Sequence, residues 1–161
     1  MIIISDTSPI SNLFIVNRLH LLHDIYDRII IPDAVYSELM ALKQSNFNLS
    51  EIQNALWIEQ KKVADISLLK QYENIIDKGE SEAMVLAKEL KADLLLIDES
   101  RGRRIAAQEG IRTIGLLGVL IEAKKMRLIK EVKPVMDELK AMARFRIKEE
   151  LYNEILKLTG E

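Results

Sequence analysis

Three short aliphatic runs constrain the fold of this chain more than any other feature. They lack the polar alternation of a sheet with one solvated face, and they read "IIIS" (2–5), "RIIIP" (28–32) and "DLLLID" (93–98). Such runs are typical of strands that are buried on both faces of a parallel sheet. Weaker strand patterns occur at "WIEQ" (57–60) and "IRTIG" (111–115). The runs therefore predict a mostly parallel sheet.

Segments of helical periodicity separate these runs, namely "DAVYSELMAL" (33–42), "ESEAMVLAKEL" (80–90) and "GRRIAAQEG" (102–110). Strands that alternate with helices predict an α/β layer fold with right-handed crossovers. Ser8 followed by Pro9 predicts a further helix, with Ser8 as its N-cap. That helix start places Asp6 in the turn between the first strand and the helix.

The last part of the chain has a different pattern. After "GLLGVLIEAKKMRLI" (115–129), residues 130–161 show two amphipathic helical stretches with a break near Arg144 and Phe145. A length of 161 residues suits one compact domain. We therefore expect a domain over 1–129 and a helical extension over 130–161, packed on the same domain or on a partner chain.

Composition limits the chemistry. The chain has no cysteine, and His20 and His23 make a poor metal-binding pair, so any metal must be held by oxygen. No signal peptide and no membrane span is recognisable, which predicts a cytoplasmic location and no membrane contact. A net charge of −2 offers no general attraction for nucleic acid, so phosphate binding would depend on the local cluster "RGRR" (101–104).

Acidic residues follow two of the predicted strands and lie on two of the predicted helices. Asp6 and Asp98 come directly after buried strands, and ligands of α/β sheets bind at the carboxyl ends of strands. Glu38 and Glu82 lie on or beside the apolar stripe of a helix. Clustered carboxylates repel one another unless a cation joins them, and Mg²⁺ or Mn²⁺ prefers oxygen ligands. The pattern predicts a one- or two-metal site that hydrolyses phosphodiesters.

Other interpretations of single residues stay open. Asp6 also fits a turn or cap, and Glu38 also fits a solvated helix position. Glu80 is assigned to a structural role, because Asp77 and Glu80 have the spacing of a capping box. Glu80 also points about 200° around the helix from Glu82.

The residues after Asp98 have two interpretations each. Glu99 is either a further ligand or a solvent-facing neighbour. Arg101, Arg103 and Arg104 begin the next helix, where arginines hold phosphate well, but each also fits a solvated helix face.

The order of these motifs resembles the PIN-domain nucleases, in particular a toxin-like (VapC-like) subgroup. The matching segments are "DTSPI" (6–10), "VYSEL" (35–39), "GESEA" (79–83) and "LIDES" (96–100), and the likeness extends over nearly the whole chain. The resemblance implies a three-layer α/β/α sandwich and C-terminal helices. It also implies that Asp6, Glu38, Glu82 and Asp98 are the catalytic metal ligands for Mg²⁺ or Mn²⁺, with Ser8 as a supporting hydroxyl.

The resemblance further implies a metal-dependent endoribonuclease that acts on RNA, often as a toxin with an antitoxin partner and often as a homodimer. A catalytically weak or inactive module of the same fold, which binds RNA or a protein, is the alternative. A phosphoryl-transfer or receiver domain fits less well, since Asp6-Thr7-Ser8 stands where such a phosphatase has Asp-x-Asp.

Overall fold

The structure, a computed structural model, describes residues 1–161 and contains a single parallel sheet of five strands in the order β3-β2-β1-β4-β5. Its strands are β1 (Ile3–Ser5), β2 (Ile29–Pro32), β3 (Ile58–Lys61), β4 (Leu94–Leu96) and β5 (Thr113–Ile114). All five lie within or overlap the runs that the sequence analysis selected. From β1 the chain first builds the sheet outward through β2 to β3 and then crosses to the other side of β1 to form β4 and β5. The switch point of the sheet therefore lies between β1 and β4.

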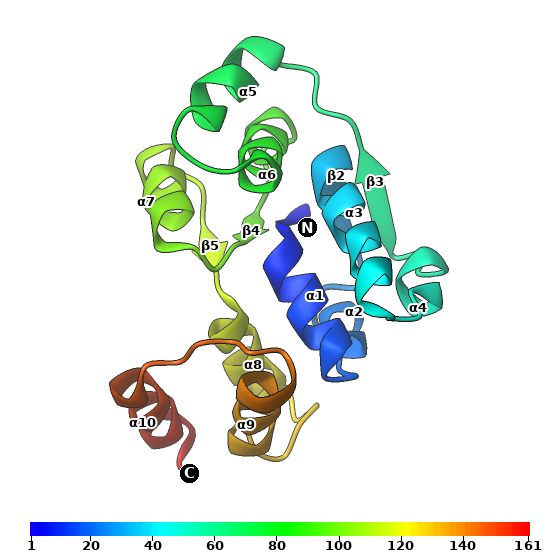
Figure 1. The fold of residues 1–161 in the computed structure, drawn as a ribbon. Coiled ribbons are helices and arrows are strands. Elements are labelled where there is room, and N and C mark those ends of the chain that lie inside the picture. Colours follow the sequence, from blue (N-terminus) through cyan, green and yellow to red (C-terminus); the bar gives the residue numbers. More distant parts are fainter.

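Ten α-helices surround the sheet (Figure 1). They are α1 (Thr7–Ile15), α2 (His20–Tyr26), α3 (Asp33–Met40), α4 (Ser50–Gln53), α5 (Ile66–Glu73), α6 (Lys78–Glu89), α7 (Ser100–Gln108), α8 (Leu116–Lys125), α9 (Lys133–Met142) and α10 (Glu149–Thr159), with a short 3-10 helix, η1 (Ala41–Ser45), after α3. No helix is long and apolar enough to cross a bilayer.

Successive strand residues point into two separate hydrophobic cores, which makes the molecule a three-layer α/β/α sandwich. Ile3 of β1 packs in the core formed with α1, α2, α8 and α9, whereas Ile4 packs in the core formed with α5, α6 and α7. This alternation follows from the two-residue period of a strand. The predicted fold class is confirmed, and α9 and Ile155 of α10 contribute to the first of these cores.

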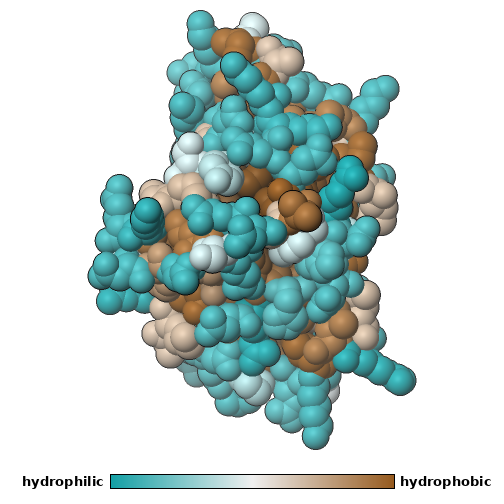
Figure 2. Space-filling view, turned by 90° about the vertical axis from the view of Figure 1, so that its right-hand side faces the viewer, coloured by the Kyte–Doolittle hydropathy of each residue, from teal (hydrophilic) through white to brown (hydrophobic).

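The surface seen from the side of β3 is mostly hydrophilic, and its hydrophobic residues form separate patches (Figure 2). The exposed face of the edge strand agrees with this view, because Gln60 and Lys61 of β3 are both exposed. Charged residues on an edge strand discourage pairing with another chain.

One local expectation is wrong. Helix α1 begins at Thr7 with Asp6 in the N-cap position, so Ser8 lies inside the first turn rather than at the cap. The Ser8 hydroxyl instead donates to Asp98 across the sheet edge. The position of Ser8 directly before Pro9 favoured the N-cap prediction. The hydroxyl donates to Asp98 instead, because a hydrogen bond to a carboxylate is stronger than one between neutral groups.

Candidate functional site at the carboxyl edge of the sheet

Asp6 occupies the centre of the sheet edge. Its backbone N–H donates to the Leu96 carbonyl at 2.9 Å, which ties the end of β1 to β4, and the residue is 6% exposed. Burial raises the pKa of Asp6 to about 8, the Thr7 backbone N–H lowers it, and the carboxylates of Glu80, Asp77 and Glu38 raise it further. A buried carboxylate among like charges takes a proton or a cation.

Glu38 reaches this site from α3. It accepts a hydrogen bond from the Thr7 hydroxyl, and its carboxylate lies against Gly79 at the start of α6. A Cβ atom at Gly79 would stand 2.5 Å from Oε2 of Glu38. The glycine therefore lets the carboxylate approach the helix start and lie near Asp6.

Glu80 is the acid of α6 whose negative charge raises the pKa of Asp6. Its backbone N–H donates to Oδ1 of Asp77 at 2.9 Å, so the predicted N-cap exists, with Asp77 capping α6. The Glu80 side chain nevertheless carries a buried oxygen, Oε1, that has no hydrogen-bond partner, and the residue is 4% exposed. Burial, and to a smaller extent the Asp77 carboxylate, raises the pKa of Glu80 to about 7, whereas the Asp77 backbone N–H lowers it.

Glu82 is buried on α6 next to the start of α3. Burial raises its pKa, but the backbone N–H of Ala34 and the ammonium of Lys78 lower it, while Asp33 acts in the opposite direction. The Ala34 N–H belongs to the first turn of α3, so Glu82 serves the positive end of that helix. Glu82 lies beside Glu38, the acid that accepts from Thr7 next to Asp6. It lines a separate hollow of about 390 Å³ beside Glu38.

Asp98 follows β4 and is held firmly. Its Oδ2 accepts from the Ser8 hydroxyl at 2.9 Å, and its Oδ1 accepts from the Leu116 backbone N–H at 2.7 Å. Ser8 in turn accepts from Asn12 at 2.9 Å. Burial raises the pKa of Asp98, whereas these hydrogen bonds and the nearby Arg103 lower it. Asp98 is thus oriented by its neighbours, on the α8 side of the edge.

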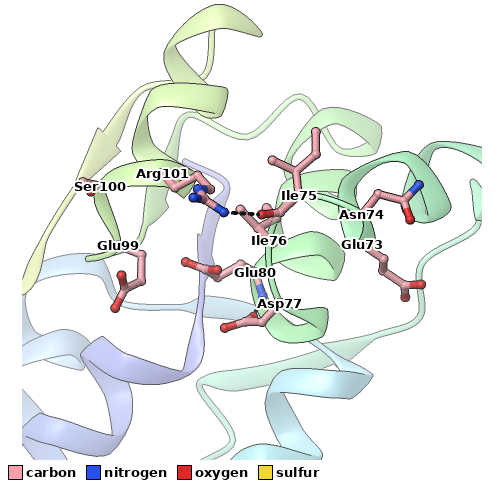
Figure 3. Close-up of a pocket in the computed structure, with 9 residues that line it drawn as sticks. All are labelled: Glu73, Asn74, Ile75, Ile76, Asp77, Glu80, Glu99, Ser100 and Arg101. Atoms are coloured by element: carbon pink, nitrogen blue, oxygen red, sulfur yellow. Dashed lines mark hydrogen bonds between the residues drawn. The ribbon is translucent and has the colours of Figure 1, made fainter.

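A hollow of about 540 Å³ lies between the start of α7 and the segment that joins α5 to α6. Figure 3 shows the side chains of Asp77, Glu80 and Glu99 facing one space, whereas Glu73 and Asn74 point away from it. Arg101 spans the hollow and donates to the Ile75 carbonyl at 3.2 Å. Glu99 therefore belongs with the acidic group on this side.

The three arginines separate. Arg101 lines the acidic hollow, Arg103 lines another hollow beside Asp98, and Arg104 is exposed and lines neither. The clustered motif "RGRR" therefore does not form one phosphate site, because successive helix residues point in different directions.

No three Asp, Glu or His side chains are arranged as a ready-made metal centre. The donor set still fits a hard cation: Mg²⁺ is commonly held by one or two carboxylates and keeps several waters, which reach the remaining acids. The partnerless Oε1 of Glu80 and the raised pKa of Asp6 are the features that a cation would satisfy. The sequence analysis assigned Glu80 to the capping box alone, and its burial with a partnerless oxygen is visible only in the structure.

The parallel α/β fold of this chain has a counterpart among solved structures. A PilT N-terminus domain protein, SSO1118, from the hyperthermophilic archaeon Sulfolobus solfataricus P2 aligns with a TM-score of 0.53 and 17% identity, over 76% of this chain and 93% of that one. At this identity the likeness concerns the fold.

The family model DUF3368, described as a PIN domain, matches residues 2–161. The chain belongs to this PIN-domain family, whose fold is of the nuclease type and typically works with divalent metal ions. No curated protein matches the chain.

Proposed function

We propose that the protein is a metal-dependent endoribonuclease that hydrolyses RNA phosphodiester bonds with Mg²⁺ or Mn²⁺. The observation that carries the proposal is that two carboxylates near the sheet edge, Asp6 and Glu80, are buried without a counter-charge. Both carboxylates are buried, burial raises the pKa of each, and one oxygen of Glu80 has no partner. Burying two negative charges without a counter-charge costs free energy, and a bound cation would remove this cost.

In this proposal Asp6 and Glu80 would hold the cation, and the acids around them, Glu38, Asp77 and Asp98, would add negative charge that favours it. A bound Mg²⁺ or Mn²⁺ lowers the pKa of an attacking water and neutralises charge on the phosphate. Thr7 orients Glu38, and Ser8 orients Asp98, through hydrogen bonds that hold each carboxylate in one rotamer. Glu82 supports the start of α3 and is a neighbour of the site rather than a ligand.

A module of the same fold that binds RNA or a protein without cleaving RNA is the second candidate. The absence of a ready-made group of three ligands favours it. The toxin role, the antitoxin partner and the homodimer follow from the resemblance and stay predictions.

One experiment separates these functions. Purified wild type and Asp6→Asn are incubated with a mixed pool of single-stranded RNA in Mn²⁺, Mg²⁺ or chelator, and metal binding is measured by calorimetry. We expect metal-dependent cleavage by the wild type alone. Metal binding without cleavage would favour the binding module. The absence of both metal binding and cleavage would refute the carboxylate site.

A further inference from the structure

A third hollow, of about 410 Å³, begins at Asp98 and extends between β5, α8 and α10. Its walls differ from those of the acidic hollow: half of its lining residues are hydrophobic, and Arg103 and Arg146 both contribute. It thus joins the candidate site to a surface that combines apolar groups with two arginines and two carboxylates, Asp98 and Glu154.

The two arginines have no ion-pair partner in the structure. The Nη1 atom of Arg103 lies 3.2 Å from the place that a Cβ of Gly115 would take, so the missing side chain leaves room for the guanidinium between α7 and α8. The Asp98 carboxylate interacts with Arg103, and its two oxygens are oriented by the Ser8 hydroxyl and the Leu116 backbone N–H. Two guanidinium groups without ion-pair partners that line one hollow suit a phosphate group, which binds arginine bidentately.

The apolar part of the hollow suits a base. Phe145 and Leu117 line it, and Glu154 adds one acceptor on the α10 side. A volume of about 410 Å³ is that of a small-ligand site, large enough for one nucleotide and far too small for a duplex. Unpaired bases in RNA are commonly recognised by stacking on aromatic or guanidinium planes.

We infer that this hollow binds one unpaired nucleotide of single-stranded RNA next to the bond that is cut. Arg103 and Arg146 hold its phosphate, Phe145 packs against its base, and Glu154 accepts from an exocyclic amino group, which disfavours uracil. The inference rests on the proposed ribonuclease function and names the part of the substrate that the enzyme reads.

The test measures RNA binding without cleavage. A fluorescein-labelled, unstructured RNA of ten nucleotides is titrated in chelator, and anisotropy is followed at several salt concentrations. Arg103→Gln and Arg146→Gln should each weaken binding about tenfold and reduce the slope of log K against log salt by about 0.7. Phe145→Leu, which keeps an apolar side chain but removes the ring, should weaken binding about fivefold or more.

Arg127→Gln is the matched control, since Arg127 is exposed and lines none of these hollows. Its binding should equal that of the wild type, and thermal unfolding should show that every variant is folded. Equal binding by the Arg103, Arg146 and Phe145 variants would overturn the inference, and so would equal competition by a duplex of the same sequence.

Two further outcomes are decisive. Leu158 lines the hollow and is 70% exposed. If the protein is a dimer and Leu158→Glu converts it to a monomer, a second copy of the chain covers this surface. That result would overturn the inference. Cleavage is measured in parallel. If Asp6→Asn abolishes cleavage and Arg146→Gln leaves it unchanged, the proposed ribonuclease function stands and the nucleotide site is refuted. Binding through the two arginines without any cleavage supports the site and refutes the ribonuclease.

Discussion

Glu80 and Glu82, two residues apart on α6, have different neighbours: the charge of Glu80 raises the pKa of Asp6, whereas the Ala34 backbone N–H at the start of α3 lowers the pKa of Glu82. Both are almost fully buried. Glu80 therefore lies in an environment that lacks a counter-charge. For Glu82, a helix terminus and Lys78 provide positive charge.

This relationship predicts a difference between two matched variants. Glu80→Gln should abolish stabilisation by Mn²⁺ and lower RNA cleavage by a factor of about 100 or more, because it removes a direct ligand. Glu82→Gln should leave Mn²⁺ stabilisation intact and lower the free energy of unfolding by about 1 kcal/mol, since it weakens a helix-terminus interaction. Thermal unfolding with and without Mn²⁺ measures both, and the reverse pattern would return Glu82 to the ligand set.

Asp6 gives a prediction on pH in metal-free protein. Burial raises the pKa of Asp6 from its ordinary value of 3.8 to about 8 in the folded protein. Between about pH 4 and pH 8 the folded state therefore keeps a proton that the unfolded state has lost. The stability that this proton provides is complete below pH 4 and is lost as the pH rises through 8. Asp6→Asn should remove this loss and be more stable than the wild type at pH 8, by the order of a few kcal/mol. Urea unfolding from pH 5 to pH 9 in chelator would show it.

Metal binding should couple to the same proton. Below pH 8 a cation must displace the proton from Asp6, so apparent Mn²⁺ affinity should rise with pH and level off above 8. Calorimetry in buffers of different ionisation enthalpy counts the released protons. An affinity that does not change between pH 6 and pH 8 would contradict the assignment of Asp6 as a ligand.

Gly79→Ala tests the placement of Glu38. The added methyl group would overlap the Glu38 carboxylate, which can swing away, so the fold should persist, and an alanine in a helix adds up to about 1 kcal/mol of stability. Activity should fall about tenfold, as for Glu38→Gln. The double variant should lose no more than either single one, because both act on one carboxylate. Additive losses would show that Gly79 acts independently of Glu38.

Ser8→Ala removes a hydrogen bond to Asp98 and should raise the pKa of that carboxyl further. A hydrogen bond to a charged group contributes about 1.5–3 kcal/mol, so the free energy of unfolding should fall by that order and cleavage should decrease. Ser11→Ala on the same helix, whose hydroxyl donates only to the Ser8 carbonyl, is the control. Equal effects of the two changes would argue against a special role of Ser8.

Glu161 provides a prediction far from the site. Its carboxylate accepts from the backbone N–H groups of Val132 and Lys133 and from Lys124 Nζ, each at 2.9 Å. Burial opposes the charge, but these hydrogen bonds outweigh it and lower the pKa to about 2. The stabilisation is present above pH 4.5 and is lost as the pH falls through 2. Glu161→Gln should cost about 1–3 kcal/mol at pH 7 and little at pH 2, with RNA cleavage at pH 7 unchanged.

The sequence by itself determined the parallel sheet and the place of its strand-end acids. Aliphatic runs and helical periods are local properties, so they located all five strands and put Asp6 and Asp98 at the sheet edge. They also located the break between the last two helices, where Arg144 adopts a φ of 53° between α9 and α10.

Only the tertiary structure decided which acids meet. Residues 79–87 of α6 are buried on every side, so periodicity could not tell which face of this helix looks toward Asp6. The contact between Thr7 and Glu38 joins residues 31 positions apart, and that between Ser8 and Asp98 joins residues 90 apart. Such contacts depend on how the crossovers place whole helices against the sheet, and this information is not contained in any local stretch of the chain.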